Sequence, residues 1–509
     1  MRLFRRTFCW VLLGALSFVP TTSLKAASTD AGAGNWRMIV LTGPTQFAEA
    51  APGSTTGLDY QAELNAIKSA QSRITPAQRR AIDYWSRGGV LRWNEILVGL
   101  VARYNLPPVP NADNTYPVPD ANNPFADPQF PFANPPYAAR AYSYVTVAQY
   151  DALKAAWYYK YLYNRPALWR VDSSIQSLMP ASDLPAYPSE DAVLSGVTAE
   201  MLKLLFPAAV EEITLKAAEQ RQAAMLAGRA TSSDLAAGLA LGQAVATAFV
   251  ARAEADGMRT AGGSPAIWAA MAASATARGE IAWKSAETPP RPPMLPLFGN
   301  VRAWMMTPTD IVRERPAPPP STSSELMARE VAEVRRHVDG ATREELAIAN
   351  FWNDGPSTPT PPGHWNLIAQ PYIRKTEMSE VRTARTFALL NMAMHDAAVA
   401  CWETKFFYFN PRPSHMDPDL KTLIGLPNFP SYTSGHSTFS SAASEVLSYI
   451  FPAGAAEFDW QKEEASISRL YAGIHYRADI EMGKAHGRRI AGYTVSFCPD
   501  RRRRLTLGG

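Results

Sequence analysis

The stretch that fixes the fold contains three short blocks: KFFYFNPRP (405–413), TSGH (433–436) and SRLYAGIHYRAD (468–479). They bring together cationic side chains, two histidines and a Ser-Gly pair in front of an apolar-periodic run (437–451). Fixed cations, imidazoles and exposed backbone N–H groups are the groups that bind a tetrahedral oxyanion. The blocks therefore predict one oxyanion site, made of Lys405, Arg412, Ser434, Gly435, His436, Arg469, His475 and Asp479.

Two of these cations differ in how they would hold an anion. Arg412 lies between Pro411 and Pro413. Each proline fixes its own φ and restricts the residue before it, so the guanidinium starts from a stiff loop. Its planar fork of donors matches phosphate-like oxygens, whereas the ammonium of Lys405 acts as a point charge. We expect both side chains to contact the anion.

The second and third blocks predict how the remaining groups are arranged. Ser434 is a predicted helix N-cap, and Gly435 would let an anion approach the backbone closely. A helix N-terminus attracts anions through its N–H groups and its dipole. His475 and Asp479 are four residues apart, so on a helix they share a face. The carboxylate would then accept from one ring nitrogen and leave the other pointed at the anion.

In this order and spacing, the blocks resemble the signature of the superfamily shared by vanadium-dependent haloperoxidases and type-2 phosphatidic acid phosphatases. The resemblance implies that His475 is the axial vanadium ligand, that His436 is the acid–base histidine beside the cofactor, and that Asp479 orients His475. The family usually has Pro before Ser-Gly-His; this chain has Thr433, which removes no ligand. The resemblance assigns the equatorial oxygens to Lys405, Arg412, Ser434, Gly435 and Arg469.

The resemblance leaves two chemistries open, because one pocket can hold vanadate or a transferring phosphoryl group. A vanadate-dependent haloperoxidase would oxidise halide with hydrogen peroxide, with Lys405 as the polarising cation. A soluble, exported acid phosphatase would hydrolyse a small phosphoester through a phosphohistidine on His475. Two aromatic residues favour the first reaction, since Trp402 and Phe429 match positions that flank the halide in chloroperoxidase-type members.

Two further features favour the haloperoxidase. The segment FWNDGPSTPTPPGHWN (351–366) is similar to one in bacterial haloperoxidase-like proteins, and we expect its Asp354 and His364 to reach the pocket. Lipid phosphatases of the superfamily are mostly short membrane proteins, whereas this chain is long. A third alternative, a non-catalytic helical binding protein, predicts broken ligands, and none of the ligand positions is broken.

Helical periodicity recurs from Tyr60 to the C-terminus and strand-type alternation is scarce, which predicts an all-α fold. Identical residues also recur at an offset of 245, among them Asp151 and Asp396, and Lys160 and Lys405. Further upstream the offset is 267. The pattern predicts an internal repeat, hence two tandem helical bundles of four-helix type. The tandem bundles agree with the architecture that the resemblance implies.

The predicted repeat is chemically asymmetric. At the offset of 245, Glu190 and Asp191 stand where the second copy has Gly435 and His436. Two carboxylates would repel an anion, so we expect only the second bundle to carry the oxyanion site. The predicted organisation is a signal peptide (1–27), an N-terminal bundle without the site (28–284), a Pro-rich linker (285–324) and a C-terminal haloperoxidase/acid-phosphatase-like bundle (325–509).

The predicted signal peptide combines a charged start, an apolar core from Phe8 to Val19 and small residues at 26–27. We therefore expect an exported protein, periplasmic or secreted, without a membrane span in the mature chain. A net charge of +4 over 509 residues gives no reason to expect a nucleic-acid partner. Cys401 and Cys498 could form a disulfide in an oxidising compartment. The oligomeric state is open, with a homodimer as one option.

Overall fold

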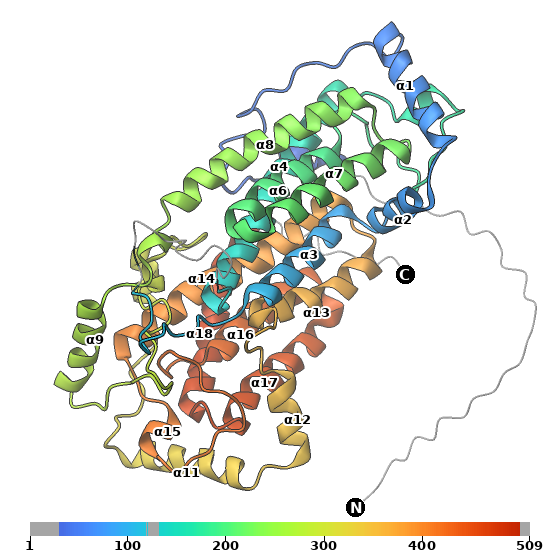
Figure 1. Ribbon diagram of the computed structural model, residues 1–509. Helices are drawn as coiled ribbons and strands as arrows, with labels where there is room; N and C mark the ends of the chain where they lie inside the picture. Colours follow the sequence, from blue (N-terminus) through green and yellow to red (C-terminus); the bar gives the residue numbers. More distant parts are fainter. Residues whose placement is uncertain (1–29, 119, 121–131, 499–509) are drawn as a thin grey trace, which may run out of the picture.

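The computed structural model describes residues 30–118, 120 and 132–498. Every regular element within these ranges is a helix, which confirms the predicted all-α fold (Figure 1). The predicted signal peptide, 1–27, lies outside the described residues, as does its cleavage position.

The first half of the chain is built around α4 (Pro135–Tyr163), a 29-residue helix that is buried along almost its whole length. α4 packs against α6, α8 and η1, and also against α13 and α14 of the second half. The other elements of this half are η1 (Ala31–Asn35), α1 (Leu58–Gln71), α2 (Pro76–Trp85), α3 (Gly89–Tyr104), α5 (Leu168–Val171), α6 (Glu190–Leu205), η2 (Pro207–Ala209), α7 (Val210–Leu226), α8 (Ser232–Glu254), η3 (Met258–Thr260) and α9 (Pro265–Ala277).

The second half is built around α14 (Glu380–Tyr408), which also has 29 residues and packs against α4, α16 and α18. α4 and α14 together form the centre of the molecule (Figure 1). The other elements are η4 (Phe298–Asn300), α10 (Pro308–Arg313), α11 (Glu325–Asp339), α12 (Arg343–Phe351), α13 (Thr360–Thr376), α15 (Pro413–Met416), α16 (Gly435–Ile450), η5 (Pro452–Gly454), α17 (Ala455–Tyr471) and α18 (Arg477–Ser496).

The helices of the two halves begin at regular intervals. α4 begins at Pro135 and α14 at Glu380, 245 positions later. The same interval separates the starts of α6 and α16, of α7 and α17, and of α8 and α18, while α11 and α12 begin 267 positions after α1 and α2. The N-cap residues of α6 and α16 show the same interval, since Ser189 and Ser434 each cap their helix through the side-chain oxygen. The two halves thus contain matching helices in the same chain order.

A buried aspartate near the middle of each long helix fixes an irregular segment. Asp151 of α4 accepts hydrogen bonds from the backbone N–H groups of residues 39–41, and Asp396 of α14 accepts from those of residues 304 and 305. The second contact lies within the Pro-rich segment 285–324, which contains η4 and α10 and runs along α14.

Glycines permit the close crossing of α8 over α6 and of α18 over α16. A Cβ on Gly242 would lie 2.3 Å from the carbonyl oxygen of Val193, and one on Gly487 would lie 2.1 Å from that of Thr438. Cβ atoms do not approach backbone oxygens so closely, so a side chain at either position would push the helices apart. The α16–α18 crossing sets the distance between two helix N-termini that matter below.

The segment Ser232–Thr260, which comprises α8 and η3, is long and apolar enough to cross a membrane by length and composition. Of its most apolar 18-residue window, 39% is buried, and α8 packs against α6 and α4. A core helix satisfies the same criteria, so this finding alone is weak evidence for a span.

The two cysteines that could have paired are separate buried thiols. The sulfur of Cys401 lies 3.7 Å from the carbonyl oxygen of Thr433, and that of Cys498 lies 3.9 Å from the carbonyl oxygen of Thr494. The disulfide that the sequence allowed is therefore not formed.

Replacing Gly487 by Ala should destabilise the protein by about 1–3 kcal/mol, because the added methyl group overpacks the α16–α18 crossing. Gly492 on the same helix is the matched control, since nothing lies within 4 Å of the position of its Cβ. Gly492→Ala should leave stability unchanged or slightly raise it. Thermal unfolding followed by circular dichroism measures both variants, and equal midpoints for the two would contradict the close crossing.

Candidate active site

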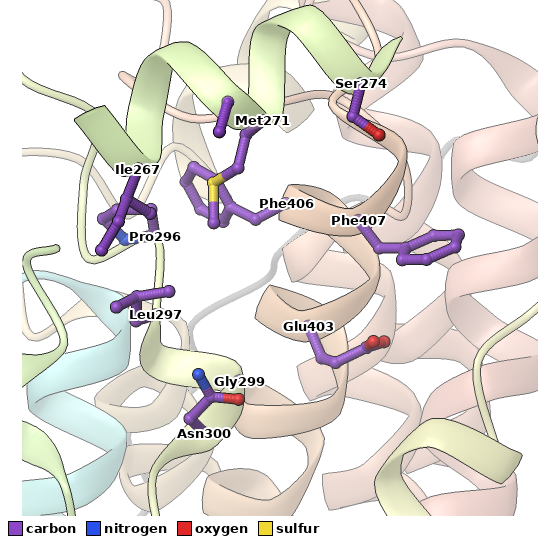
Figure 2. A pocket seen from close by; sticks show the side chains of 11 residues that line it. Ile267, Met271, Ser274, Pro296, Leu297, Gly299, Asn300, Glu403, Phe406 and Phe407 are labelled. Atoms are coloured by element: carbon purple, nitrogen blue, oxygen red, sulfur yellow. The ribbon is translucent and has the colours of Figure 1, made fainter. Parts of the chain in front are cut away.

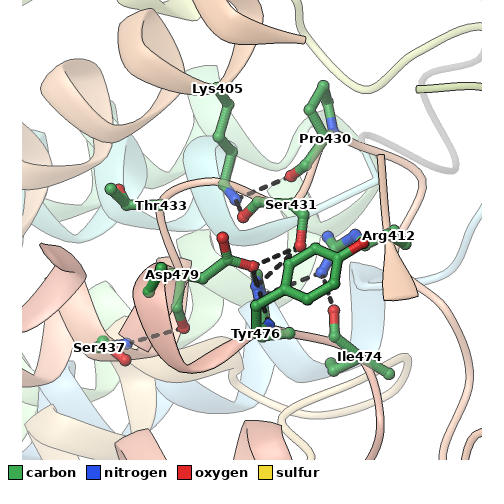
Figure 3. Close-up of polar contacts among 12 residues, drawn as sticks. Lys405, Arg412, Pro430, Ser431, Thr433, Ser437, Ile474, Tyr476 and Asp479 are labelled. Carbon is green, nitrogen blue, oxygen red and sulfur yellow. Dashed lines mark hydrogen bonds and ion pairs between the residues drawn. The ribbon is translucent and has the colours of Figure 1, made fainter. Parts of the chain in front are cut away.

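The three blocks meet where several helices end or begin (Figure 3). Lys405 lies in the last turn of α14, Arg412 is the N-cap of α15, and Arg469 lies in the last turn of α17. Ser434 is the N-cap of α16, and His475 stands two residues before α18. The predicted residues therefore come together from five separate places in the second half.

The predicted contact between His475 and Asp479 is present, with Nδ1 2.8 Å from Oδ2. The pair does not lie on one helix face, however, because α18 begins only at Arg477. Asp479 instead lies in the first turn and reaches back across the helix N-terminus, where its Oδ2 also accepts from the hydroxyl of Ser431. Four residues of separation bring two side chains together across a capping turn as well as along a helix.

The other ring nitrogen of His475 faces a cation. Nε2 lies 3.0 Å from Nη1 of Arg412, and because a guanidinium only donates, Nε2 is the acceptor. Burial, followed by the charges of Arg412 and Lys405, lowers the pKa of His475 well below its ordinary value. The ring is therefore neutral, with its proton on Nδ1 toward Asp479 and a free electron pair on Nε2. This is the form that binds a metal or attacks as a nucleophile.

Three cations of the site are buried without a neutralising partner. Lys405, Arg412 and Arg469 are each at most 1% exposed. Each donates to backbone carbonyl oxygens, such as those of Pro430 and Ser431 for Lys405. Within the described ranges, no carboxylate oxygen lies within 4.0 Å of their nitrogens.

The missing counter-charge is reflected in the pKa values of the three cations. Burial lowers the pKa of Lys405 to about 7 and those of Arg412 and Arg469 to about 10. Taking a charge out of water without a partner costs several kcal/mol. A bound anion would remove this cost, so the donor set fits an oxyanion with several negative charges.

Open space lies in front of the N-terminus of α16. The hydroxyl of Ser434 caps the helix by accepting from the N–H of Ser437 at 3.3 Å. A Cβ on Gly435 would meet nothing nearer than Phe439 at 3.8 Å and Trp402 at 4.0 Å. Since a glycine leaves this space unfilled, an anion there can approach the first N–H groups of the helix.

The two aromatic residues predicted beside the halide lie together. The rings of Trp402 and Phe429 are 5.0 Å apart, and both side chains are buried. The ammonium of Lys405 lies 5.0 Å from the ring centre of Phe429. These rings therefore form an apolar wall next to one of the buried cations.

His436 lies in the first turn of α16 and faces the segment that the sequence singled out upstream. Its Nε2 is 3.4 Å from Oδ2 of Asp354, which is longer than an ordinary hydrogen bond. Oδ1 of Asp354 lies 3.1 Å from Nδ1 of His364. Burial and the charge of Arg469 lower the pKa of His436 to about 4. Asp354 and His364 thus reach the site, as expected.

Ser431 was missed by sequence reasoning. Besides its contact with Asp479, its carbonyl oxygen accepts from Lys405, so this one residue touches two parts of the site. A serine in an irregular loop carries no motif, and its position three residues before Ser434 is the only signal that the sequence offers.

The equivalent place in the first half is filled by the chain itself. Lys160, 245 positions before Lys405, donates to the carbonyl oxygen of Pro185 and lies 2.7 Å from a carboxylate oxygen of Glu190. Arg229 contacts both Glu190 and Asp191. Burial raises the pKa of Glu190, but the charges of Lys160 and Arg229 outweigh it and hold that pKa below its usual value. This lysine is therefore neutralised internally.

A separate surface pocket of about 420 Å³ lies between α9 and α14 (Figure 2). Its walls are mainly apolar, with Ile267 and Met271 on one side and Phe406 on the other, and Glu403 lies at its edge. None of the predicted site residues lines it, although Lys405 is a close neighbour in the chain. The oxyanion site and this pocket lie on different faces of α14.

Comparison with known families gives a match over residues 385–503, to the model of the PAP2 superfamily. We call residues 385–503 the PAP2 domain, after the family model that they match. The PAP2 domain contains every residue of the predicted oxyanion site, and the resemblance noted in the sequence is confirmed.

The chain is also similar to a named enzyme and to solved structures. Over 117 residues, the chain is 30% identical to the vanadium chloroperoxidase of Curvularia inaequalis; the match covers 17% of this chain and 19% of that enzyme. The structure superposes on a bacterial vanadium-dependent iodoperoxidase with a TM-score of 0.56 and 25% identity, covering 71% of this chain and 91% of the other. A bacterial vanadium-dependent chloroperoxidase without its cofactor shares the fold, with a TM-score of 0.50, 14% identity and coverage of 70% and 92%.

Phosphate or orthovanadate should stabilise the PAP2 domain by supplying the missing negative charge. At a hundred times its dissociation constant, an anion adds about 2.7 kcal/mol to the free energy of unfolding. Arg469→Gln should abolish most of the resulting rise in the thermal midpoint. Arg477→Gln, which removes a half-exposed cation two residues beyond His475, should retain it. If neither phosphate nor orthovanadate raises the thermal midpoint of the wild type, the three buried cations do not bind an anion.

Proposed function

We propose that the protein is a vanadate-dependent haloperoxidase, which oxidises halide with hydrogen peroxide. The observation that carries the proposal is the set of three buried cations without a carboxylate partner, gathered around the open N-terminus of α16. The similarity to a bacterial vanadium-dependent iodoperoxidase, at 25% identity over most of both chains, supports it.

In this proposal each residue of the site has one task. Lys405, Arg412 and Arg469, with Ser434 and the backbone of Gly435, would hold the oxygens of vanadate through charge-assisted hydrogen bonds. When bound, vanadate supplies a Lewis acid that activates peroxide toward halide. Lys405 is well placed to polarise the bound oxygens, because it is held by two carbonyl groups at the edge of the aromatic wall.

The two histidines take different tasks because their surroundings differ. Nε2 of His475 has a free electron pair and would bind the vanadium, while Asp479 fixes the ring through Nδ1. His436 would accept and release protons, since it makes no hydrogen bond to the other site residues and keeps 15% of its side chain exposed. Trp402 and Phe429 would bound the place of the halide.

The alternative is a soluble acid phosphatase acting on a small phosphoester. The same free electron pair on His475 could attack phosphorus, with His436 protonating the leaving group. The match to the PAP2 superfamily model supports this reaction as much as the first one.

We infer that the two halves are an internal duplication in two tandem bundles, with an active site only in the second. The common intervals between helix starts support this inference, and so does the internal neutralisation of Lys160 by Glu190. We further propose that the protein works after export, in the periplasm or outside the cell, as its predicted signal peptide implies.

With orthovanadate, hydrogen peroxide and bromide or iodide, the protein should halogenate monochlorodimedone, and added phosphate should inhibit by competing for the same cations. His475→Ala should abolish the reaction, because it removes the nitrogen that would bind the vanadium. Hydrolysis of p-nitrophenyl phosphate is measured in parallel on the vanadate-free protein. Efficient hydrolysis without any halogenation would establish the phosphatase instead.

Asp191→Ala should leave turnover within about twofold of the wild type, because Asp191 belongs to the half whose cation is neutralised internally. The steady-state rate of halogenation, or of phosphoester hydrolysis, measures this. A loss of tenfold or more in a variant that keeps its thermal midpoint would show that the first half takes part in the chemistry.

A further inference from the structure

Asp354 stands between two histidines at the edge of the site. Its Oδ1 is 3.1 Å from Nδ1 of His364, and its Oδ2 is 3.4 Å from Nε2 of His436. The carboxylate is nearly inaccessible, with 6% of its side chain exposed. Both histidines are therefore coupled to one buried carboxylate, which can contact each of them through a different oxygen.

His364 lies on the outer side of this group. It belongs to the first turn of α13, stacks on Trp352 at 4.3 Å and meets the edge of Phe351, whose side chain is largely exposed. Its side chain is 15% exposed. Within the described chain, Nε2 of His364 has no hydrogen-bond partner, so this nitrogen is free to exchange a proton with water.

The loop that carries Asp354 is held by the first half of the chain. The side-chain amide of Asn105, at the end of α3, donates to the carbonyl oxygens of Gly355 and Thr358 at 2.9 and 3.1 Å. The backbone N–H of Ser357 donates in turn to the carbonyl oxygen of Asn105 at 2.8 Å. Such tethering keeps the carboxylate fixed between the two rings.

The charged and titratable groups around the carboxylate favour its ionised form. Burial raises the pKa of Asp354, but the contacts with His364 and His436 outweigh this and hold it below the usual value. From α17, Arg469 adds a positive charge that also acts on His436, and from α4 the buried hydroxyl of Tyr142 feels the charge of Asp354. An ionised Asp354 can accept a hydrogen bond from each histidine.

We propose that His364 and Asp354 form a proton relay between solvent and His436. The relay rests on the proposed function, in which His436 is the acid–base group. Halide, hydrogen peroxide and one proton give hypohalous acid and water, so each turnover takes up one proton. His364 takes this proton from water at Nε2 and passes its Nδ1 proton to Asp354. The carboxylic acid then turns about its Cβ–Cγ bond, which carries the new O–H from the side of His364 to that of His436. There it delivers the proton to Nε2 of His436, which releases its Nδ1 proton toward the anion site.

The coupling is tested first without any activity. The chain has seven histidines, so ¹⁵N-histidine NMR of the anion-free protein can be assigned by single substitutions. In the wild type, the signals of His436 should show a second inflection at the pH where His364 titrates, because both rings share one carboxylate. Asp354→Asn should remove that inflection. Independent titration of the two histidines in the wild type would overturn the relay.

The kinetic test uses His364→Phe, which keeps the stacking on Trp352 but carries no proton. Its kcat should fall at least tenfold, with the largest loss at alkaline pH, and added imidazole should restore part of it. The phosphate-induced rise of the thermal midpoint should stay unchanged, which shows that the anion site is intact. His364→Gln serves as a second variant if the phenylalanine does not fold.

A matched control lies on α11, where His337 pairs with Glu345 at 2.9 Å and contacts the ring of Tyr471. His337→Phe should keep the wild-type kcat and pH profile. Full kcat in His364→Phe, or a loss that imidazole does not restore, would overturn the relay. If the wild type shows no halogenation at all, the proposed function fails, and the NMR titration alone still decides whether the three groups are coupled.

Discussion

Three buried cations in the second half, Lys405, Arg412 and Arg469, have no carboxylate partner among the described residues, and the surrounding structure must accommodate their charge. The carbonyl oxygens around Lys405, Arg412 and Arg469 orient these groups, but the partial charge of a carbonyl does not cancel a full positive charge. The surrounding helices must therefore hold the cations together against their mutual repulsion. The tight crossing of α16 and α18 and the length of α14 provide a frame that does not relax around them.

The lysines at corresponding positions of the two halves, Lys160 and Lys405, have opposite electrostatic surroundings. Lys160 and Lys405 both lie in the last turn of a 29-residue helix, and both donate to carbonyl groups of the loop that precedes α6 or α16. What differs is the first residue of α6 in the first half and of α16 in the second. Glu190 brings a carboxylate to Lys160, whereas Gly435 leaves open space. The carboxylate of Glu190 neutralises Lys160 from within the chain, whereas the glycine at 435 leaves room for an anion from solution beside Lys405.

The residues of the site could be predicted where the constraint on them is local. Arg412 is stiffened by the prolines on either side of it, and Ser434 caps the helix that follows it. Both roles could be predicted from a few consecutive residues. The contact of His475 with Asp479 was predicted correctly but was assigned to a helix face, because a separation of four residues does not distinguish a helical turn from a capping turn. The all-α fold followed from periodicity over long segments.

Other parts of the site depend on chain segments that are far apart, and no local pattern marks them. Ser431 acquires its contacts only after the loop before α16 folds against α14 and α18. Asn105 is 250 residues away from Gly355, and its role in holding that loop becomes visible only in three dimensions. Neither residue type is unusual at its position. Tertiary packing, rather than composition, makes them part of the site.

The contact made by Asn105 gives the first half a role that its own chemistry does not suggest. In the described part of the first half, Lys160 is neutralised internally, yet α3 and α4 of this half contact the segment that carries Asp354 and begins α13. A side chain on Gly363 would collide with Tyr142 of α4, so this junction is tightly packed. Because the position of Asp354 is fixed from outside the PAP2 domain, the surroundings of His436 depend on both halves. The domain that matches the superfamily is thus not the whole of the candidate active site.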